Sequence, residues 1–524
     1  MKRNPVRTIL VILLLAAPSR AQRDAVNAST EPDYLDWGWT ALVLNNDLIT
    51  LAVVPDIGAR VMQYDLGENH SIFVNEAELG KLYTPSSNST WHNYGGYKTW
   101  PAPQERWNWP PPPNLDFGIY ESQIQGSADS ASVFSSGPKE RWKTPDLRFE
   151  RRLTIYRNTS RVKVEQTLIN EGTRIQTWSV WDVTQQIVNH PGERDYDNFW
   201  VYFPINPDSR YGSSGVRTSA SSDAWRGEVA PGVYGVRFRP EGKKIFADSH
   251  RGWVGYVDER DGVAYFKVFA VHTDLSYPDE GARVEVWINN NPLYLEVEVL
   301  GPMTELAPGG GRTTFTEEWY AARCHGPILD ANRVGAVTRR LKYDTQSSVL
   351  SGEYGVFHRG TAQAVFRDPG GAELGRGPSH AVDPLAPFAL SEAGALPWGT
   401  ARVAIEISDK TGLLIGVLEE GDIDRLTGVN PVPVSIPSGH VLRPNYPNPF
   451  NPSTVIPFRL SRPGQVTLEI YDRRGRLVEE LFSGPLGAGE HQRIWRPAGL
   501  ASGIYFCRLI FDDYQTTRKM LLLH

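Results

Sequence analysis

Apolar and polar residues alternate along most of the chain with the period of two that is typical of a β-strand. Clear runs of this alternation lie at residues 162–168, 284–288, 403–407 and 466–470. Successive side chains of a strand point to opposite faces, so the pattern predicts half-buried antiparallel strands bounded by Gly, Pro, Asn and Asp. Helical periodicity is hard to find anywhere in the sequence. The chain is therefore predicted to be an all-β protein.

The predicted strands fall into three groups. Residues 34–325 hold too many strands for one small sandwich and are expected to form a single large β-sandwich domain. Residues 341–428 fit a small immunoglobulin-like sandwich. Residues 429–440 are a proline-spaced, fairly stiff linker, and residues 441–524 form a third β unit. Three units also suit a chain of 524 residues, at the usual ~100–200 residues per domain.

The N-terminus has the three parts of a secretory signal peptide. A basic stretch at residues 2–7 precedes an apolar run at residues 9–17, and the small residues Ser19 and Ala21 follow. We expect cleavage after Ala21, so that residues 1–21 are removed. The apolar run is too short to span a bilayer, and no later stretch approaches the ~18 apolar residues that a membrane helix needs. The mature protein is expected to be exported and not membrane-spanning.

Composition narrows the possible functions. The chain has 16 Trp, 22 Tyr and 19 Phe, and its 48 Gly and 39 Pro favour long, shaped loops between strands. A net charge of -6 without a basic stripe argues against a nucleic-acid binder. The 2 cysteines are too few for a disulfide framework. Motifs of zinc proteases, serine esterases, nucleotide hydrolases and dinucleotide enzymes are missing from the sequence, and no cofactor is predicted.

The C-terminal unit carries the most specific motifs. It opens with Asn-Tyr-Pro-Asn-Pro-Phe-Asn-Pro at residues 445–452, has Gly-Ala-Gly-Glu-His at residues 487–491, and closes with the strand at residues 517–523. These motifs closely resemble the type A C-terminal sorting domain of the type IX secretion system, a small immunoglobulin-like sandwich. The resemblance implies export by the type IX machinery of a Gram-negative bacterium, usually with removal of this domain, and then release or attachment at the outer cell surface. An ordinary terminal β-sandwich is the alternative.

A tryptophan-rich loop is the candidate binding element. Residues 91–113 contain four tryptophans, interleaved with Lys98, Gln104 and other polar residues. Prolines keep this backbone extended and exclude most of it from a central strand. Flat apolar faces beside hydrogen-bonding groups suit a sugar ring, whose C–H face packs on an indole while its hydroxyls pair with polar side chains. The alternative is a satellite core in which the tryptophans only pack beneath the loop.

Four segments carry a second resemblance. They are Gly58-Ala-Arg60, the loop at residues 95–104, the strand at residues 178–182, and the strand at residues 294–298 with its following turn. They look like a galactose-mutarotase-type family, domain of unknown function 4380. The resemblance implies a β-supersandwich, which aldose epimerases share with domains of polysaccharide lyases and glycosidases, but it implies no activity. The predicted sugar-binding residues are Arg60, Lys98, Trp100, Gln104, Trp107 and Trp109. The predicted architecture is this supersandwich followed by two small immunoglobulin-like sandwiches.

Glu296 and Glu298 are the candidate acid–base residues. They share one face of a predicted strand at roughly 6.5–7 Å between backbones, where one carboxylate raises the pKa of the other if both are partly buried. By the resemblance, Glu296 matches the mutarotase glutamate that takes the anomeric proton. The family's histidine before Gly-Gly is replaced by Tyr94. The partner acid is then His92, Asp182 or Tyr94, or there is no chemistry and the glutamates are solvated.

The function that these patterns predict is an exported carbohydrate-binding protein. Three alternatives stay open: a carbohydrate epimerase, lyase or glycoside hydrolase, a non-catalytic surface binder, and a structural or adhesive surface protein. An acidic loop with Glu193, Asp195, Asp197 and Asn198 offers oxygen ligands for Ca²⁺, but the sequence favours a solvated loop, and no metal site is predicted.

Overall fold

Two compact units divide the chain, Met1–Gly428 and Val429–His524. The computed structural model describes residues 26–190, 192, 196–219, 225–427, 441–443, 445–460, 464–486, 489–497, 499–511 and 514–523. The predicted signal peptide (residues 1–21) and the predicted linker (residues 429–440) lie outside these described residues.

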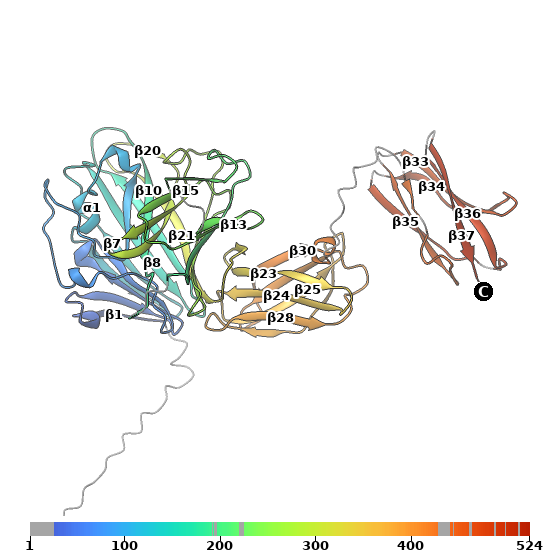
Figure 1. Cartoon of the computed structure of the whole chain (residues 1–524), viewed down its shortest axis with the longest axis horizontal. Helices are drawn as coiled ribbons and strands as arrows, with labels where there is room; N and C mark the ends of the chain where they lie inside the picture. Colours follow the sequence, from blue (N-terminus) through green and yellow to red (C-terminus); the bar gives the residue numbers. More distant parts are fainter. Residues whose placement is uncertain are drawn as a thin grey trace, which may run out of the picture. The chain divides into compact units, whose positions relative to one another are not determined.

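Strands form nearly all of the regular structure (Figure 1). The described helical segments are short: α1 (Pro113–Phe117), α2 (Ile423–Leu426), and the 3-10 turns η1 (Tyr34–Asp36), η2 (Pro55–Ile57), η3 (Glu76–Glu78) and η4 (Gln104–Arg106). The prediction of an all-β protein is confirmed.

Two large antiparallel sheets form the first sandwich. The first sheet has the order β1 (Asn27–Glu31), β2 (Ala41–Asn45), β3 (Ile49–Val54), β4 (Arg60–Leu66), β5 (Tyr97–Ala102), β10 (Gln176–Gln186), β19 (Leu293–Leu300), β18 (Val284–Asn290), β15 (Lys243–Ala247) and β12 (Val216–Thr218), with β20 (Thr304–Leu306) paired to β10. The second has the order β13 (Arg226–Ala230), β14 (Val233–Arg237), β11 (Phe199–Pro204), β16 (Trp253–Asp258), β17 (Val263–Phe269), β21 (Gly311–Arg323), β9 (Val162–Asn170), β8 (Leu147–Tyr156), β7 (Ser130–Ser136) and β6 (Glu121–Gly126).

A smaller pair of sheets follows in the same compact unit. One has the order β22 (Asp330–Ala331), β23 (Gly335–Asp344), β24 (Val349–Val356) and β28 (Phe388–Ala393). The other has the order β26 (Glu373–Arg376), β25 (Gly360–Arg367), β29 (Arg402–Ser408) and β30 (Leu414–Asp422), with β27 (His380–Val382) paired to β25. Ile328 and Phe357 pack in one apolar cluster with Phe266 and Tyr320 of the large sandwich. The predicted domain boundary between residues 325 and 341 stays a prediction.

The second unit is another small pair of sheets. Its three-stranded sheet has the order β31 (Val441–Leu442), β32 (Thr454–Leu460) and β35 (Gly489–Trp495). Its four-stranded sheet has the order β34 (Leu477–Leu486), β33 (Gly464–Asp472), β36 (Gly503–Phe511) and β37 (Tyr514–Leu522). Trp495, Phe458 and Leu509 are buried in its apolar core. A large sandwich followed by two small ones is the predicted fold class, and the sheets confirm it.

The alternating pattern of β19 shows how the large sandwich is built. Leu295, Val297 and Val299 are buried in the apolar cluster that also holds side chains of the second sheet. Full burial of each such side chain stabilises the fold by roughly 1.5–3 kcal/mol. Because successive side chains alternate, Glu296 and Glu298 point to the opposite face of the first sheet. That outward face carries the candidate site described below.

A small ionic cluster lies between the two large sheets. The Lys267 ammonium contacts the Asp182 carboxylate and donates a hydrogen bond of 2.9 Å to the Val297 carbonyl. Glu317 lies beside them and accepts a 2.8 Å hydrogen bond from Trp319 Nε1. Burial, and then the neighbouring Asp182 carboxylate, raise the pKa of Glu317 well above its ordinary value. Burial therefore favours the protonated form of Glu317, and Lys267 is the counter-ion of Asp182.

We predict that Lys267→Met lowers the free energy of unfolding by about 3–5 kcal/mol, because it leaves Asp182 buried without its cation. Lys163→Met is the matched control, since the Lys163–Glu165 pair of the second sheet is partly exposed. Exposed pairs of this kind contribute less than about 1 kcal/mol. Denaturant unfolding followed by tryptophan fluorescence measures both. Equal losses in the two variants would contradict the stabilising role of the interior cluster.

Candidate functional site

A pocket lies on the outward face of the first large sheet. Its volume is about 320 Å³, and its lining residues are Trp91, Trp100, Gln104, Trp109, Trp181, Lys244, Trp287, Asn289, Tyr294 and Glu296. Most of these side chains come from β5, β10, β19, β18 and β15, which are consecutive neighbours in the sheet. The remainder come from the tryptophan-rich loop on either side of β5.

Strand register brings the pocket side chains together. Trp100 of β5 lies directly opposite Trp181 of β10. Glu296 of β19 lies opposite Gln185 of β10 on one side and opposite Trp287 of β18 on the other. Directly paired residues project from the same face of a sheet, so these side chains converge although they are far apart in sequence.

The tryptophans form an edge-to-face array. The Trp100 ring centroid lies 5.3 Å from that of Trp181 and 6.2 Å from that of Trp109, and Trp109 lies 5.0 Å from Trp91. Trp100 is only 3% exposed, whereas Trp109 is 51% exposed. The Trp100 ring is therefore the buried part of the array, and the Trp109 ring is the part exposed to solvent. The satellite-core alternative fits Trp100 and Trp107, which are buried, but it does not fit Trp109.

Hydrogen bonds hold the tryptophan-rich loop in place. Trp107 Nε1 donates to the Pro101 carbonyl at 2.7 Å, which folds the loop back on β5. Lys143 Nζ donates to the carbonyls of Asn108 and Pro110 at 3.1 and 2.6 Å. Trp107 is buried by this arrangement and does not line the pocket, so its predicted contact with a sugar is not supported by its position.

Arg60 also lies behind the pocket and does not line it. Its guanidinium is fully buried, pairs with Asp116 at 2.6 Å and donates to the Gly95 carbonyl at 3.0 Å. Asp116 in turn accepts a 2.9 Å hydrogen bond from Trp100 Nε1. Gly58, two residues before Arg60, has a φ of +85°, and a Cβ there would lie 2.1 Å from the Asp116 carbonyl oxygen. The Gly-Ala-Arg motif thus holds the segment around Asp116, which positions Trp100. Arg60 was predicted to contact the ligand, and its buried position does not support that contact.

Glu296 is the carboxylate that reaches the pocket. Its Oε1 accepts hydrogen bonds from Lys98 Nζ at 2.8 Å and Gln185 Nε2 at 3.0 Å, and its side chain is 10% exposed. Among the residues that the structure describes, nothing donates a hydrogen bond to its Oε2. Lys98 lies behind Glu296, with Nζ 5.0 Å from the Trp100 ring centroid. Burial lowers the pKa of Lys98, and the Glu296 charge opposes that shift.

Glu298 is fully buried and does not line the pocket, but it contacts two residues that do, Trp181 and Lys244. It accepts a 2.6 Å hydrogen bond from Trp181 Nε1 and pairs with Lys244 Nζ at 2.7 Å. Lys244 also pairs with Glu285 of β18 at 2.8 Å, and its Nζ lies 4.6 Å from the Trp181 ring centroid. Burial raises the pKa of Glu298, and burial likewise raises the pKa of Glu285 to about 8. Lys244 lines the pocket, whereas the two glutamates lie behind it.

Sequence reasoning missed Lys244, Glu285, Trp181 and Trp287. Glu285 and Trp287 alternate with the buried Val284 and Val286 on β18, so the pattern placed them on one face. It gave no indication of which distant strand would lie beside them. That pairing depends on the order β10-β19-β18-β15 in the sheet.

The predicted partner acids do not lie in the pocket. Asp182 points into the sandwich interior, because on β10 it alternates with the outward-facing Trp181 and Gln185. His92 is stacked on Tyr83, with ring centroids 3.5 Å apart, and its ring meets Phe117 edge to face. These positions correct the expectation that Asp182 or His92 sits beside Glu296. The other candidate acid, Tyr94, is buried against Trp39.

Of the other predicted residues, Trp100, Gln104, Trp109 and Glu296 line the pocket, and Lys98 and Glu298 lie directly behind it. The candidate Ca²⁺ loop is described only in part. Glu193 and Asp195 lie outside the described residues, and Asp197 contacts the guanidinium groups of Arg239 and Arg237.

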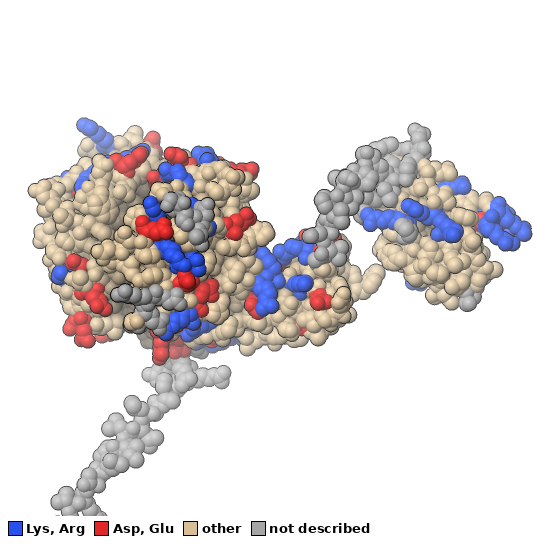
Figure 2. All heavy atoms as spheres, in the orientation of Figure 1, with Lys and Arg blue, Asp and Glu red and all other residues tan. Residues whose placement is uncertain are grey.

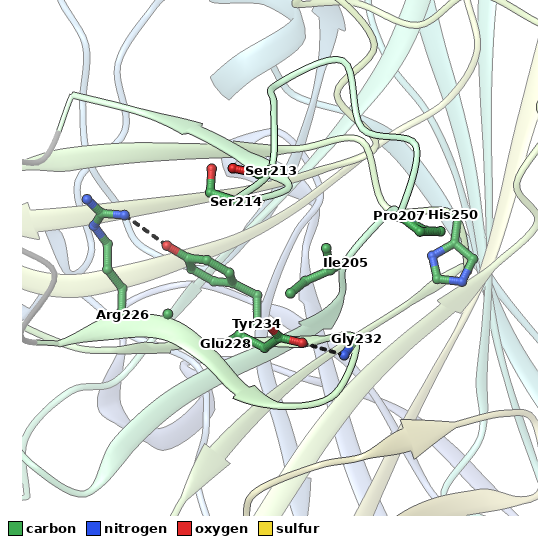
Figure 3. A pocket seen from close by; sticks show the side chains of 10 residues that line it. Ile205, Pro207, Ser213, Ser214, Arg226, Glu228, Gly232, Tyr234 and His250 are labelled. Atoms are coloured by element: carbon green, nitrogen blue, oxygen red, sulfur yellow. Dashed lines mark hydrogen bonds between the residues drawn. The ribbon is translucent and has the colours of Figure 1, made fainter. Parts of the chain in front are cut away.

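A larger pocket of about 700 Å³ lies at the edge of the second sheet, by β13 and β14. Figure 3 shows Tyr234 in its wall, accepting a 2.8 Å hydrogen bond from Arg226 Nη1, and Glu228 accepting one of 2.8 Å from the Gly232 amide. Tyr234 and His250 are the ring-bearing side chains among the described residues that line it. The smaller tryptophan pocket is the stronger candidate because it combines aromatic faces with convergent polar groups.

Surface charge adds no single-sign feature on the visible face of the first unit. Figure 2 shows Lys and Arg interspersed there with Asp and Glu. A nucleic-acid site normally needs a continuous basic stripe.

Comparison with known proteins identifies the end of the chain. Residues 445–522 match the family described as the secretion system C-terminal sorting domain. This domain indicates handling by the type IX secretion system and a cell-surface or extracellular location. No curated protein matches the chain. Among the described residues, none of the helices has the length and apolar character needed to cross a membrane.

Solved structures similar to the chain include galactose mutarotase-like proteins. A galactose mutarotase-like protein from Clostridium acetobutylicum is 11% identical, covers 57% of this chain and 99% of its own, and has a TM-score of 0.37. A galactose mutarotase related enzyme from Lactobacillus acidophilus is 9% identical, covers 55% and 100%, and has a TM-score of 0.36. A TPR-domain containing protein from Parabacteroides distasonis is 13% identical over 59% of this chain and 56% of its own, with a TM-score of 0.38.

The raised pKa of Glu285 gives a test of the charge arrangement. Between its unfolded pKa, about 4.3, and its folded pKa of about 8, the folded state keeps a proton that the unfolded state has released. The contribution of Glu285 to the free energy of unfolding therefore falls as the pH rises through this window. Glu285→Gln has no such proton, so its unfolding free energy relative to the parent protein should increase from about pH 6 to about pH 9.

Urea unfolding at both pH values measures this difference. Glu165→Gln is the control, because Glu165 is a partly exposed glutamate of the second sheet. If the unfolding free energy of Glu285→Gln differs from that of the parent protein by the same amount at both pH values, the folded protein holds the Glu285 carboxyl ionised throughout.

Proposed function

We propose that the protein is an exported carbohydrate-binding protein and that the tryptophan pocket is its sugar site. The observation that carries the proposal is that five tryptophans line one pocket together with the polar side chains of Gln104, Asn289, Tyr294 and Glu296. An indole face packs against the C–H face of a sugar ring, and amide, phenol and carboxylate groups pair with its hydroxyls. The volume of about 320 Å³ lies at the small end of the roughly 300–1,000 Å³ range of small-molecule sites.

The sorting domain supports the exported location. The chain carries it at residues 445–522, and the predicted signal peptide at residues 1–21 would supply the first export step. A surface or extracellular protein meets polysaccharide outside the cell, where a sugar site is useful. The location does not distinguish a binder from an enzyme.

A second candidate function is acid–base catalysis on the bound sugar by Glu296. The observation that favours it is the position of the carboxylate, whose Oε1 is held by Lys98 and Gln185 while its Oε2 has no hydrogen-bond donor among the described residues. A carboxylate positioned in this way can accept a proton from a ligand hydroxyl. Burial raises the pKa of Tyr294, so this neighbouring phenol stays protonated and serves as a hydrogen-bond donor.

Tryptophan variants separate binding from packing. We predict that Trp109→Ala weakens sugar binding by about 1 kcal/mol or more with little change in melting temperature, because this ring is half-exposed. Trp100→Ala should instead lower the free energy of unfolding by about 3–5 kcal/mol, because its ring is buried. Titration with saccharides by tryptophan fluorescence and thermal unfolding measure the two effects. If Trp109→Ala binds every parent ligand unchanged, the pocket is not the sugar site.

A glutamate variant separates catalysis from binding. If the pocket is catalytic, Glu296→Gln should lower kcat by about 10²-fold or more while sugar affinity changes little, because the amide keeps the shape and removes the proton acceptor. Glu305→Gln, an exposed residue of β20, is the control. Turnover at the parent rate would remove Glu296 from the mechanism, and a parent protein that binds sugars without turnover is a binder.

A further inference from the structure

The ammonium groups at the pocket are already neutralised by carboxylates. Lys98 pairs with Glu296 at 2.8 Å, and Lys244 pairs with Glu298 at 2.7 Å and Glu285 at 2.8 Å. Glu285 and Glu298 are buried, so water does not compete for these contacts and the pairing is stronger than at a surface. Neither lysine has a charge left over for a ligand.

Positive and negative charges balance at neutral pH. Because burial raises the pKa of Glu285 to about 8, this carboxyl keeps its proton there. Burial raises the pKa of Glu298 too, so Glu285 and Glu298 share a proton and oppose Lys244 together, while Glu296 faces Lys98. An anionic group entering the pocket would meet the Glu296 carboxylate and, in Lys244, an ammonium that is already paired.

The cations around the pocket are engaged as well. Arg60 is held by Asp116. Lys143 donates to loop carbonyls, and the Arg106 guanidinium contacts the Thr177 carbonyl and lies 5.3 Å from the Trp178 ring centroid. None of these three groups lines the pocket.

We infer that the pocket selects uncharged sugars and rejects uronates and sulfated sugars, with Glu298 as the specificity-determining residue because it neutralises Lys244 at the pocket wall. This inference rests on the proposed sugar site. Burying an anion without a partner is unfavourable, and specificity often comes from such a penalty on the wrong ligand. Lyase chemistry on uronates needs the sugar carboxylate to be neutralised in the site, so the same pairing argues against it.

Binding of matched sugar pairs by the full-length protein tests the inference. Galactose and galacturonic acid, and glucose and glucuronic acid, differ in the oxidation of one carbon and therefore isolate the charge. Short neutral oligosaccharides and their uronate counterparts extend the series. Isothermal titration calorimetry should give at least about tenfold tighter binding of the neutral member of each pair that binds. Uronates that bind as tightly as their neutral partners overturn the inference alone, whereas no binding by any sugar rejects the proposed function and the inference with it.

Two variants assign the selectivity to the Lys244 pairing. Glu298→Gln keeps an acceptor for Trp181 Nε1, and combined with Glu285→Gln it removes both carboxylates that pair with Lys244, so in this double variant the preference for neutral sugars should fall by about tenfold. Lys244→Met should keep the rejection of uronates, since no cation recognises them in the parent protein. A loss of uronate affinity in Lys244→Met would show that Lys244 already binds anions and would overturn the inference. The parent sugar series decides the question even if either variant fails to fold.

Discussion

The central strands of the first sheet are buried on both faces, and the pocket follows from this constraint. On β19, Val297 and its neighbours fill the sandwich interior, while Glu296 and Glu298 face outward beneath the tryptophan-rich loop. An outward face open to water would tolerate isolated charges. A covered one requires each charge to have a partner, since an unpaired buried charge is strongly unfavourable.

The ion pairs of the sheet therefore have two consequences at once. Each lysine stabilises a carboxylate that burial would otherwise protonate, and each carboxylate removes a positive charge that could attract an anionic ligand. The fully interior pair, Asp182 with Lys267, has only the first consequence. Pairs of similar composition thus differ in function according to which face of the sheet they occupy.

The sequence predicted the strands, the tryptophan-rich loop and the shared strand face of Glu296 and Glu298, because each depends on local pattern. It could not orient Asp182, since β10 carries large apolar residues on both faces and alternation alone does not say which face meets the core. It also missed the Lys244–Glu285 pair, whose members are brought together by strand order. Arg60 was identified by motif, but its burial against Asp116 depends on a close approach between distant segments.

Most polar groups of the pocket lie on strands, so the sheet fixes their positions relative to one another. Hydrogen-bonded register fixes Glu296 relative to Gln185 and Trp287, while Trp109 sits on a loop. That loop is tied down by Lys143 and by the Trp107 hydrogen bond to β5, so its indole wall is held without being part of the sheet. A site with strand-borne polar groups and a restrained aromatic wall loses little conformational entropy on binding. If the pocket binds sugars as proposed, ligand selection depends mainly on charge and ring shape, because the paired charges and the indole rings are held in fixed positions.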